Sequence, residues 1–388
     1  MLNDKISVGI VADWLVTFAG AEKVIKEFLE LYPEAELYSI IDFLSDKTRM
    51  DAFKNKRAKT SFIQKMPKAR SKYQNYLPLM PLAVEQLDVS HHDVILSSSH
   101  AVAKGVLTGP DQLHISYVHS PIRYAWDLQH QYLKESGLNR GFKGSLAKYI
   151  LHKMRMWDYR TVNGVDHFVA NSQFIARRIK KVYGRDADVI YPPVDVQRYE
   201  LVDNKDDYYV TASRLVPYKK VDLVVEAFAH MPTKKLVVIG DGSEMEKIKK
   251  VAGKNTNIEI LGYQSDEAMK NLMAKAKAFV FAAEEDFGIT PVEAQACGTP
   301  VIAFGKGGSL ETVRPYGESS ATGIHFPQQS VDSLIVAIEK FDVISESISP
   351  LDCRTHAEKF STARFRKEID AYVSNKWQDF SEKKRIQY

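Results

Sequence analysis

The chain has 388 residues, of which 45% are hydrophobic and 26% are charged, and its formal net charge is +4. These values are ordinary for a globular protein, and the length is enough for two α/β domains at roughly 100–200 residues each. The two cysteines, Cys297 and Cys353, exclude a disulfide framework and favour a reducing compartment. So small a net charge gives no reason to expect a nucleic-acid partner.

The beginning of the sequence and its apolar runs bear on localisation. Met1-Leu-Asn-Asp-Lys precedes a short apolar run to Val11, which differs from the charged start and long apolar core of a signal peptide. Nowhere does an apolar run approach the ~18 residues that a membrane-spanning helix needs. We therefore expect a cytoplasmic protein, with peripheral attachment to the inner face of the cell membrane as an alternative.

Short apolar runs alternate with longer helical patterns along the chain. In the first half the pattern predicts a helix at 21–31 and strands at 6–12, 36–41, 93–99, 114–119 and 167–171. In the second half it predicts strands at 208–213, 235–240, 258–262, 278–282 and 300–304, and helices at 220–229, 243–251, 266–275 and 291–296. Such alternation is typical of parallel sheets with helices on both faces, and its repetition predicts two doubly wound α/β domains.

The boundary between these domains is predicted from Tyr191-Pro-Pro-Val-Asp195 to Asn204-Lys-Asp-Asp207. The paired prolines interrupt regular structure, and the stretch that follows is charged and loop-like. We therefore predict an N-terminal domain at 1–195 and a C-terminal domain at 196–365. Residues from about 355 to 384 have helical periodicity.

The stretch from Lys54 to Lys72, called here the basic segment, has eight basic residues, no acidic residue and several apolar side chains. One interpretation is a solvated loop. The other is attraction to an anionic membrane, at about 1 kcal/mol per basic residue near charged lipid, or recognition of a phosphate-bearing acceptor.

Segment 282–301 carries two glutamates at the carboxyl end of a predicted strand, where open α/β sheets bind ligands. Glu285 lies on the loop, and Glu293 lies in the first turn of the next helix. Backbone N–H groups at such a helix start can bind an anion, and the carboxylates can accept hydrogen bonds from sugar hydroxyls. Thr290, Pro291 and Glu293 also fit a capping box, so Glu293 has a structural interpretation as the N3 residue of a helix capped by Thr290.

Another loop, after the strand predicted at 208–213, carries Arg214 and Lys219. Two fixed cations at this place would stabilise the negative charge that grows on a departing diphosphate. Solvated surface residues are the structural alternative.

In the first half, Gly20 precedes a helix and lets a backbone amide approach a phosphate. Segment 116–127 closes a strand and turns at Pro121. It supplies a histidine, a cation and aromatic faces that suit sugars and phosphate: His119, Arg123, Tyr124 and Trp126. Trp126 fits a core position equally well. His91, His92 and Asp93 do not have convincing metal spacing, and we predict no metal site.

Glu285-Asp-Phe-Gly-Ile-Thr-Pro-Val-Glu293 resembles the E-x7-E motif of the retaining GT-B glycosyltransferases called group 1, or family 4. The continuation to Ile302 and the sequence Gly307-Gly-Ser-Leu-Glu311 are also typical of that family. The resemblance extends over essentially the whole chain. Residues His119 to Trp126 are similar to bacterial transferases of surface polysaccharide assembly, many of which are mannosyltransferases.

The resemblance implies two Rossmann-like domains that face each other across a cleft, with residues 366–388 packing back on the N-terminal domain. The C-terminal domain would hold the sugar nucleotide, and the N-terminal domain would present the acceptor. Catalytic roles fall to His119, Arg214, Lys219 and Glu285, and substrate binding to Gly20, Arg123, Tyr124, Gly288, Ile289 and Glu293.

In these roles Glu285 would contact the donor sugar and Glu293 the nucleotide ribose, while amides around Gly288 and Ile289 would face the sugar and the diphosphate. The family often has two glycines where this chain has Ala19 and Gly20, which bears on how closely the backbone approaches the phosphate.

The implied activity is a retaining, metal-independent hexosyl transfer without a cofactor. The expected donor is GDP-mannose, and the expected acceptor is a saccharide or lipid-linked saccharide of surface polysaccharide, such as lipopolysaccharide. Front-face attack is the usual proposal for the family, with the leaving phosphate taking the acceptor's proton, so no general base is assigned. Three alternatives remain: a sugar-nucleotide epimerase of the same fold, a non-catalytic sugar-nucleotide-binding protein, and a peripheral membrane scaffold built on the basic segment.

Overall fold

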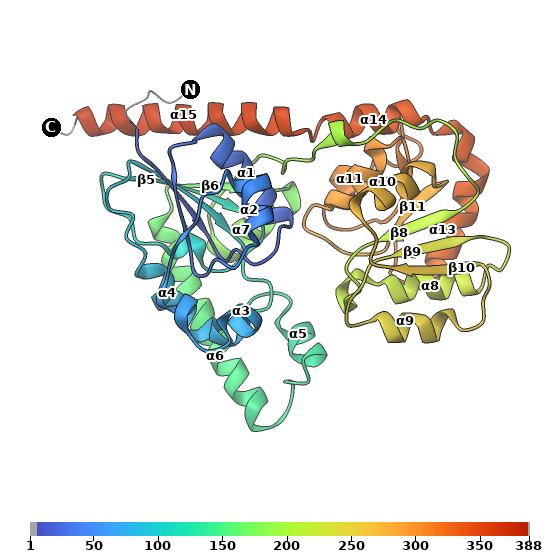
Figure 1. Ribbon diagram of the computed structural model, residues 1–388, viewed down its shortest axis with the longest axis horizontal. Coiled ribbons are helices and arrows are strands. Elements are labelled where there is room, and N and C mark those ends of the chain that lie inside the picture. Colours follow the sequence, from blue (N-terminus) through green and yellow to red (C-terminus); the bar gives the residue numbers. More distant parts are fainter. Residues whose placement is uncertain (1–5, 387–388) are drawn as a thin grey trace. The chain divides into compact units, whose positions relative to one another are not determined.

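The computed structural model describes residues 6–386, which form two compact units (Figure 1). Unit 1 comprises Met1–Pro193 and Ala363–Tyr388, and unit 2 comprises Val194–Thr362. The sequence patterns predict boundaries after residues 195 and 365. Residues 1–5, on which part of the expectation about a leader peptide rests, lie outside the described residues.

Unit 1 contains a parallel sheet with the strand order β3-β2-β1-β4-β5-β6-β7. The strands are β1 Val8–Ala12, β2 Glu36–Ser39, β3 Lys59–Thr60, β4 Val94–Ser99, β5 Leu113–Val118, β6 His167–Ala170 and β7 Asp188–Val189. β1, β4 and β5 are buried along their whole lengths, as expected for central strands covered on both faces.

The helices of unit 1 are α1 Gly20–Leu31, α2 Asp46–Phe53, α3 Ala69–Lys72, α4 Met80–Glu85, α5 Gln129–Glu135, α6 Gly141–Arg160, α7 Gln173–Tyr183 and α15 Thr362–Ile386. Phe28 of α1 and Phe365 of α15 share a core with Ile10 of the sheet. Met80 of α4 and Met154 of α6 belong to a second core. The helix α15 is held to this unit by an ion pair between Arg366 Nε and Glu27 Oε2 at 2.5 Å.

Unit 2 contains a parallel sheet with the order β10-β9-β8-β11-β12-β13. Its strands are β8 Tyr209–Ala212, β9 Leu236–Ile239, β10 Ile258–Gly262, β11 Ala278–Phe281, β12 Val301–Phe304 and β13 Gly323–Phe326. Its helices are α8 Val221–Ala229, α9 Met245–Ala252, α10 Asp266–Lys275, α11 Ile289–Ala296, α12 Ser309–Thr312, α13 Val331–Ile344 and α14 Pro350–Glu358. Phe228, Ile248 and Phe341 bring α8, α9 and α13 onto one core with the sheet.

Every predicted strand forms, and the expectation of two doubly wound parallel sheets is confirmed. The sequence patterns missed β3, β7 and β13. Two of these, β3 and β7, lie at the edges of their sheet and have two residues each. Strands this short are too brief to show a hydrophobic pattern in the sequence. Among residues 6–386, no helix has both the length and the apolar character that crossing a bilayer requires.

Candidate active site

The carboxyl ends of β8, β11 and β12 lie side by side in unit 2, because these strands are neighbours in the parallel sheet. The loop after β8 carries Arg214 and Lys219, and the loop after β11 carries Glu285. The β12 loop approaches the same place, since Gly308 N donates to the carbonyl of Glu285 at 2.8 Å. Unit 2 therefore brings the predicted cations and the first glutamate to one edge of its sheet.

Lys219 and Glu285 form an ion pair between Nζ and Oε1. Their side chains are 15% and 18% exposed, so both retain access to solvent while most of their surface is covered. A partly desolvated ammonium group at a strand end is suited to bind the oxygens of a diphosphate, with Glu285 holding it in place beforehand.

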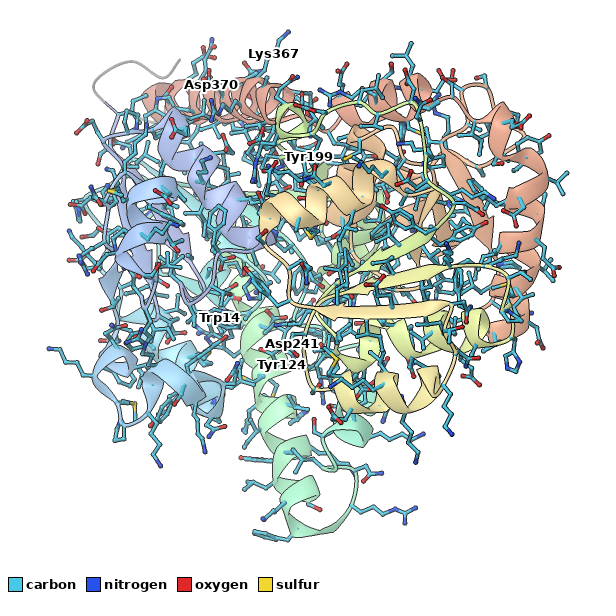
Figure 2. All side chains as sticks on the ribbon, turned by 45° about the vertical axis from the view of Figure 1, so that its right-hand side comes forward. Trp14, Tyr124, Tyr199, Asp241, Lys367 and Asp370 are labelled. Carbon is cyan, nitrogen blue, oxygen red and sulfur yellow. The ribbon has the colours of Figure 1, made fainter. Side chains whose placement is uncertain are left out.

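Glu293 is buried in α11, and its carboxylate accepts a hydrogen bond from the hydroxyl of Tyr199. Burial raises the pKa of Tyr199, and the neighbouring Glu293 raises it further. Tyr199, labelled in Figure 2, was not predicted as a site residue, because it lies in the loop-like stretch after the paired prolines. It fixes the orientation of the carboxylate that the sequence had singled out.

The capping-box interpretation of Glu293 is wrong. The helix α11 begins at Ile289, with Gly288 as its N-cap at φ 90°, so Thr290 and Pro291 already lie inside the first turn. Glycine adopts that positive φ without strain, and proline is tolerated there because first-turn N–H groups have no partner within the helix. Glu293 lies beyond the N3 position, and its side chain has no role in capping Thr290.

The other predicted residues of unit 2 lie at the same sheet edge. Gly288 and Ile289 form the start of α11, where unpaired backbone N–H groups are available to an anion. Arg214 is exposed, and its Nη2 lies 3.4 Å from the hydroxyl of Tyr218. Arg214 and Lys219 therefore extend from one short loop, and Arg214 is the more exposed of the two.

In unit 1, Gly20 is the first residue of α1, at the end of the loop that follows β1. The carboxylate of Glu22 accepts a hydrogen bond from Ala19 N at 2.9 Å and so closes the helix start. Ala19 has φ −134° and ψ −155°, an extended conformation that alanine adopts freely. The replacement of the family's first glycine by Ala19 therefore leaves the backbone of this helix start unstrained.

His119 follows β5, and its Nε2 lies 2.8 Å from Ser98 Oγ on β4. Burial lowers the pKa of His119 to about 3, and the neighbouring His100 contributes to the same shift. The imidazole is therefore neutral at physiological pH. A neutral, oriented ring can exchange hydrogen bonds with sugar hydroxyls without adding charge.

The sequence patterns missed the pair formed by Asp13 and His100, which lies beside His119. The buried carboxylate of Asp13 accepts hydrogen bonds from the backbone N–H groups of residues 100–103 at 2.5–3.0 Å, and His100 Nδ1 lies 2.9 Å from its Oδ2. Burial opposes ionisation of Asp13, but His100 and these amides outweigh it and hold the pKa of the carboxyl below its usual value. The ring of Trp14 packs edge-on against His100, with centroids 4.5 Å apart.

The remaining predictions in unit 1 divide into two kinds. Trp126 is a structural residue, because its Nε1 donates to the buried Asp158 at 2.7 Å. Arg123 and Tyr124 are partly exposed in the turn after β5, and Tyr124 packs near Tyr132 with ring centroids 5.9 Å apart. Trp14 and Tyr124, both labelled in Figure 2, pack against one core and supply the aromatic surface of this region.

The basic segment is partly neutralised. Lys54 pairs with Glu30, Arg57 with Asp46 and Lys59 with Glu36. The later residues of the segment, Lys65, Lys68, Arg70 and Lys72, have exposed side chains.

A different surface of unit 1 was not predicted. The helix α6 carries an exposed apolar stripe at helical spacing, and its members are Phe142, Leu146, Tyr149 and Met156, at 85%, 49%, 58% and 55% exposure. Exposed lysines lie along the same helix at positions 143, 148 and 153. Both views show the first half of α6 projecting from the body of unit 1 (Figures 1 and 2).

Comparison with known families identifies the chain. The family described as "Glycosyl transferases group 1" matches residues 196–360, and the one described as "Glycosyltransferase Family 4" matches residues 19–198. The two matches meet near the boundary between the units. The chain belongs to the group 1, family 4 glycosyltransferases.

Two curated relatives illustrate the similarity. A GDP-mannose-dependent monoacylated α-(1-6)-phosphatidylinositol monomannoside mannosyltransferase of Corynebacterium glutamicum is 31% identical over 199 residues, which cover 44% of this chain and 51% of that protein. The α-1,3/1,6-mannosyltransferase ALG2 of Saccharomyces cerevisiae is 29% identical over 220 residues, which cover 42% and 44% of the two chains. The matches thus span about half the length of these relatives.

Solved structures agree on the fold. Anabaena Alr3699/HepE in complex with UDP-glucose has a TM-score of 0.67 and 18% identity, with 95% of this chain and 99% of that chain covered. The lipopolysaccharide outer core galactosyltransferase WaaB has a TM-score of 0.65 and 16% identity, with 96% and 100% covered. The fold is therefore GT-B, as the sequence resemblance implied.

Proposed function

We propose that this glycosyltransferase transfers a hexose with retention from a nucleotide sugar, with GDP-mannose as the preferred donor, to a lipid-linked saccharide of surface polysaccharide. The observation that carries the proposal is the edge of the unit 2 sheet, where Lys219 pairs with Glu285 beside the start of α11. The mannosyltransferases among the relatives support the choice of donor.

Each residue at this edge has a role in the proposed reaction. Lys219 and Arg214 stabilise the departing diphosphate, and the N–H groups at Gly288 and Ile289 bind its oxygens. Glu285, released from Lys219 when the phosphate takes over that cation, accepts hydrogen bonds from the donor sugar. Glu293 accepts from the ribose.

Unit 1 contributes the remaining roles. The amide at Gly20 helps to bind phosphate, and neutral His119 hydrogen-bonds a sugar hydroxyl. Arg123 and Tyr124 contact the acceptor. No side chain is assigned as a general base, because the leaving phosphate takes the acceptor's proton. The reaction needs neither a metal ion nor a cofactor in this proposal, so the transfer rate should persist in a chelator.

We propose that the acceptor is linked to a lipid because α6 carries the exposed apolar stripe. Apolar side chains flanked by lysines on a projecting helix fit the interface of an anionic membrane, where the stripe is buried and the lysines meet lipid phosphates. The partly neutralised basic segment is then a secondary contact.

The test is a panel of GDP- and UDP-sugars, assayed for binding, slow hydrolysis and transfer, with the anomeric configuration of the product read by NMR. GDP-mannose should be preferred, and the product should be the α-anomer. Lys219→Ala should lower the rate with the preferred donor by about 10²–10³. The matched control is Lys250→Ala, which removes an exposed lysine of α9 and should leave the rate unchanged. Turnover of Lys219→Ala at the control's rate would remove the basis of the assignment.

A further inference from the structure

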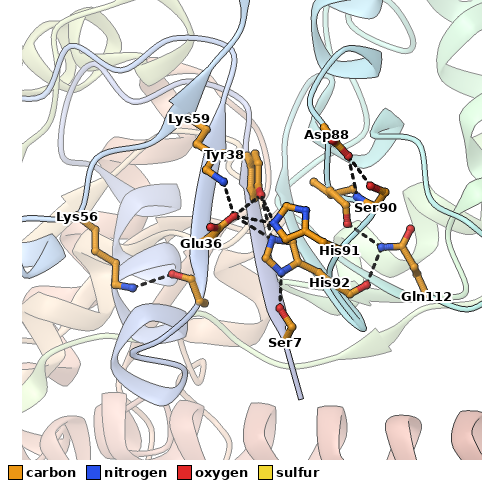
Figure 3. A network of polar contacts seen from close by, with 12 residues as sticks. Ser7, Glu36, Tyr38, Lys56, Lys59, Asp88, Ser90, His91, His92 and Gln112 are labelled. Atoms are coloured by element: carbon orange, nitrogen blue, oxygen red, sulfur yellow. Dashed lines mark hydrogen bonds and ion pairs between the residues drawn. The ribbon is translucent and has the colours of Figure 1, made fainter. Parts of the chain in front are cut away.

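Figure 3 shows a cluster of polar side chains at the amino ends of strands of the unit 1 sheet. His119 and Asp13, by contrast, follow the carboxyl ends of β5 and β1. Glu36 is the first residue of β2, and His91 and His92 come just before β4. β2 and β4 flank β1 in the sheet, so the three side chains meet across the amino end of β1. One nitrogen from each histidine and one oxygen from Glu36 lie within 4.8 Å of one another. None of these residues takes part in the proposed transfer reaction.

The distances within this cluster fit a tetrahedral metal ion. Glu36 Oε2 lies 2.9 Å from His91 Nε2 and 3.3 Å from His92 Nε2. Zinc bonds of about 2.0–2.1 Å place the ligands of a tetrahedron roughly 3.3 Å apart. The hydroxyl of Tyr38 lies 2.9 Å from His92 Nε2 and 3.3 Å from His91 Nε2, at the position of a fourth ligand or of a group that holds a bound water.

The surroundings orient the histidines. Ser7 Oγ lies 2.6 Å from His92 Nδ1, a contact that suits a proton on Nδ1 and leaves the lone pair of Nε2 facing Glu36. The ring of His92 is held at close range by the backbone of β1, because a Cβ added to Gly9 would lie 2.7 Å from His92 Cδ2. His91 is half exposed, which gives an ion a path to the site.

From these observations we propose that Glu36, His91 and His92 form a binding site for a divalent transition ion of the Zn²⁺ class, which clamps β2 to the segment before β4. Imidazole nitrogen and carboxylate oxygen are the ligands that zinc prefers among the residues present. Lys59 Nζ lies 2.6 Å from Glu36 Oε2, and its side chain is 57% exposed. Lys59 is thus an exposed cation that pairs with the same Glu36 oxygen, and it would compete with the ion for that ligand.

The competition makes the proposal testable by binding alone. Full-length protein, stripped with a chelator, is titrated with Zn²⁺ in competition with a chromogenic chelator, and with Co²⁺ to record the visible absorption of tetrahedral coordination. We expect one ion per chain. His91→Gln should weaken Zn²⁺ binding by at least tenfold, and Lys59→Met should strengthen it several-fold.

The control is His152→Gln, which removes an exposed histidine of α6 and should leave Zn²⁺ affinity unchanged. Far-UV circular dichroism of the metal-free variants checks that each is folded. His91 is chosen because it is half exposed, whereas replacement of the buried His92 could disturb folding. Equal affinity in wild type and His91→Gln overturns the proposal, as does an unchanged affinity in Lys59→Met. At the same Zn²⁺ concentration, the ion should also raise the unfolding temperature of wild type more than that of His91→Gln, whatever the outcome of the transferase assays.

Discussion

Single residues of the candidate site could be predicted where a strand and the loop after it lie in one continuous segment of the sequence. Arg214, Lys219, Glu285 and Gly288 all follow strand ends that the apolar runs mark clearly. Asp13 could not be found in this way, because its hydrogen-bond donors at residues 100–103 lie 87–90 positions along the chain. Glu36 is separated from His91 by 55 positions, so sequence spacing gave no hint that they meet.

Replacement of Glu293 by glutamine separates ligand binding from structure. Since the side chain does not cap α11, Glu293→Gln should unfold like the wild type, while its KM for the donor should rise about tenfold or more through loss of a charged hydrogen bond to the ribose. Steady-state kinetics and thermal unfolding measure the two effects. Tyr199→Phe removes the hydroxyl that orients this carboxylate but keeps the charge of Glu293, so it should raise donor KM by a smaller factor. A lowered stability of Glu293→Gln with an unchanged KM would contradict the ribose role.

Asp13 should control the acid stability of unit 1. Its pKa is lowered in the folded state, so its contribution to stability is fully present above the unfolded pKa of about 3.9 and is lost as the pH falls through the folded value. Asp13→Asn should lower the free energy of unfolding by about 2–4 kcal/mol at pH 7. The side-chain amide of asparagine would turn an N–H group toward backbone N–H groups whose hydrogen bonds the carboxylate accepts.

The measurement is urea unfolding followed by tryptophan fluorescence at several pH values. The difference in the free energy of unfolding between wild type and Asp13→Asn should become smaller below about pH 4. Asp51→Asn, which changes an exposed carboxylate of α2, is the control and should stay within about 0.5 kcal/mol of wild type. A constant difference down to pH 3 would show that the charge of Asp13 is not the cause.

At the scale of elements, the strands were easier to predict than the helix boundaries. Strand runs such as 278–282 are continuous and apolar, and burial on both faces makes that pattern unambiguous. The predicted start of α11 at residue 291 was wrong because Thr290-Pro291 resembles a helix start, whereas Gly288 with its positive φ is the N-cap and the helix begins two residues earlier, at Ile289. The helix α6 escaped prediction because its exposed face is apolar, which disguises its periodicity.

The exposed stripe of α6 leads to a prediction about membranes. Phe142→Ser combined with Leu146→Ser should reduce binding to liposomes with anionic lipid by about tenfold or more, since each exposed side chain loses up to 1.5–3 kcal/mol of burial in the interface. Co-sedimentation with anionic and with neutral vesicles measures the effect. Val343→Ser combined with Leu351→Ser removes equally exposed apolar residues from unit 2 and is the control. Equal binding of both double variants would exclude the stripe as the membrane contact.

At the scale of the whole molecule, the chain's four tryptophans all fall in unit 1, at positions 14, 126, 157 and 377. Tryptophan fluorescence therefore reports the unfolding of unit 1 alone, whereas calorimetry records both units. This distribution, which the sequence displays once the units are known, allows each unit's stability to be followed in the intact protein.

The proposed donor site predicts which unit a nucleotide stabilises. A nucleoside diphosphate at about 100 times its Kd should stabilise the unit that binds it by about 2.7 kcal/mol. Because the ribose and phosphate ligands are assigned mainly to unit 2, GDP should raise a calorimetric transition that occurs without a change in tryptophan fluorescence, and should move the fluorescence transition less. Lys219→Ala should reduce the shift, and Lys250→Ala should preserve it. A fluorescence transition that rises as far as the calorimetric one, in both wild type and Lys219→Ala, would place the main nucleotide contacts in unit 1 instead.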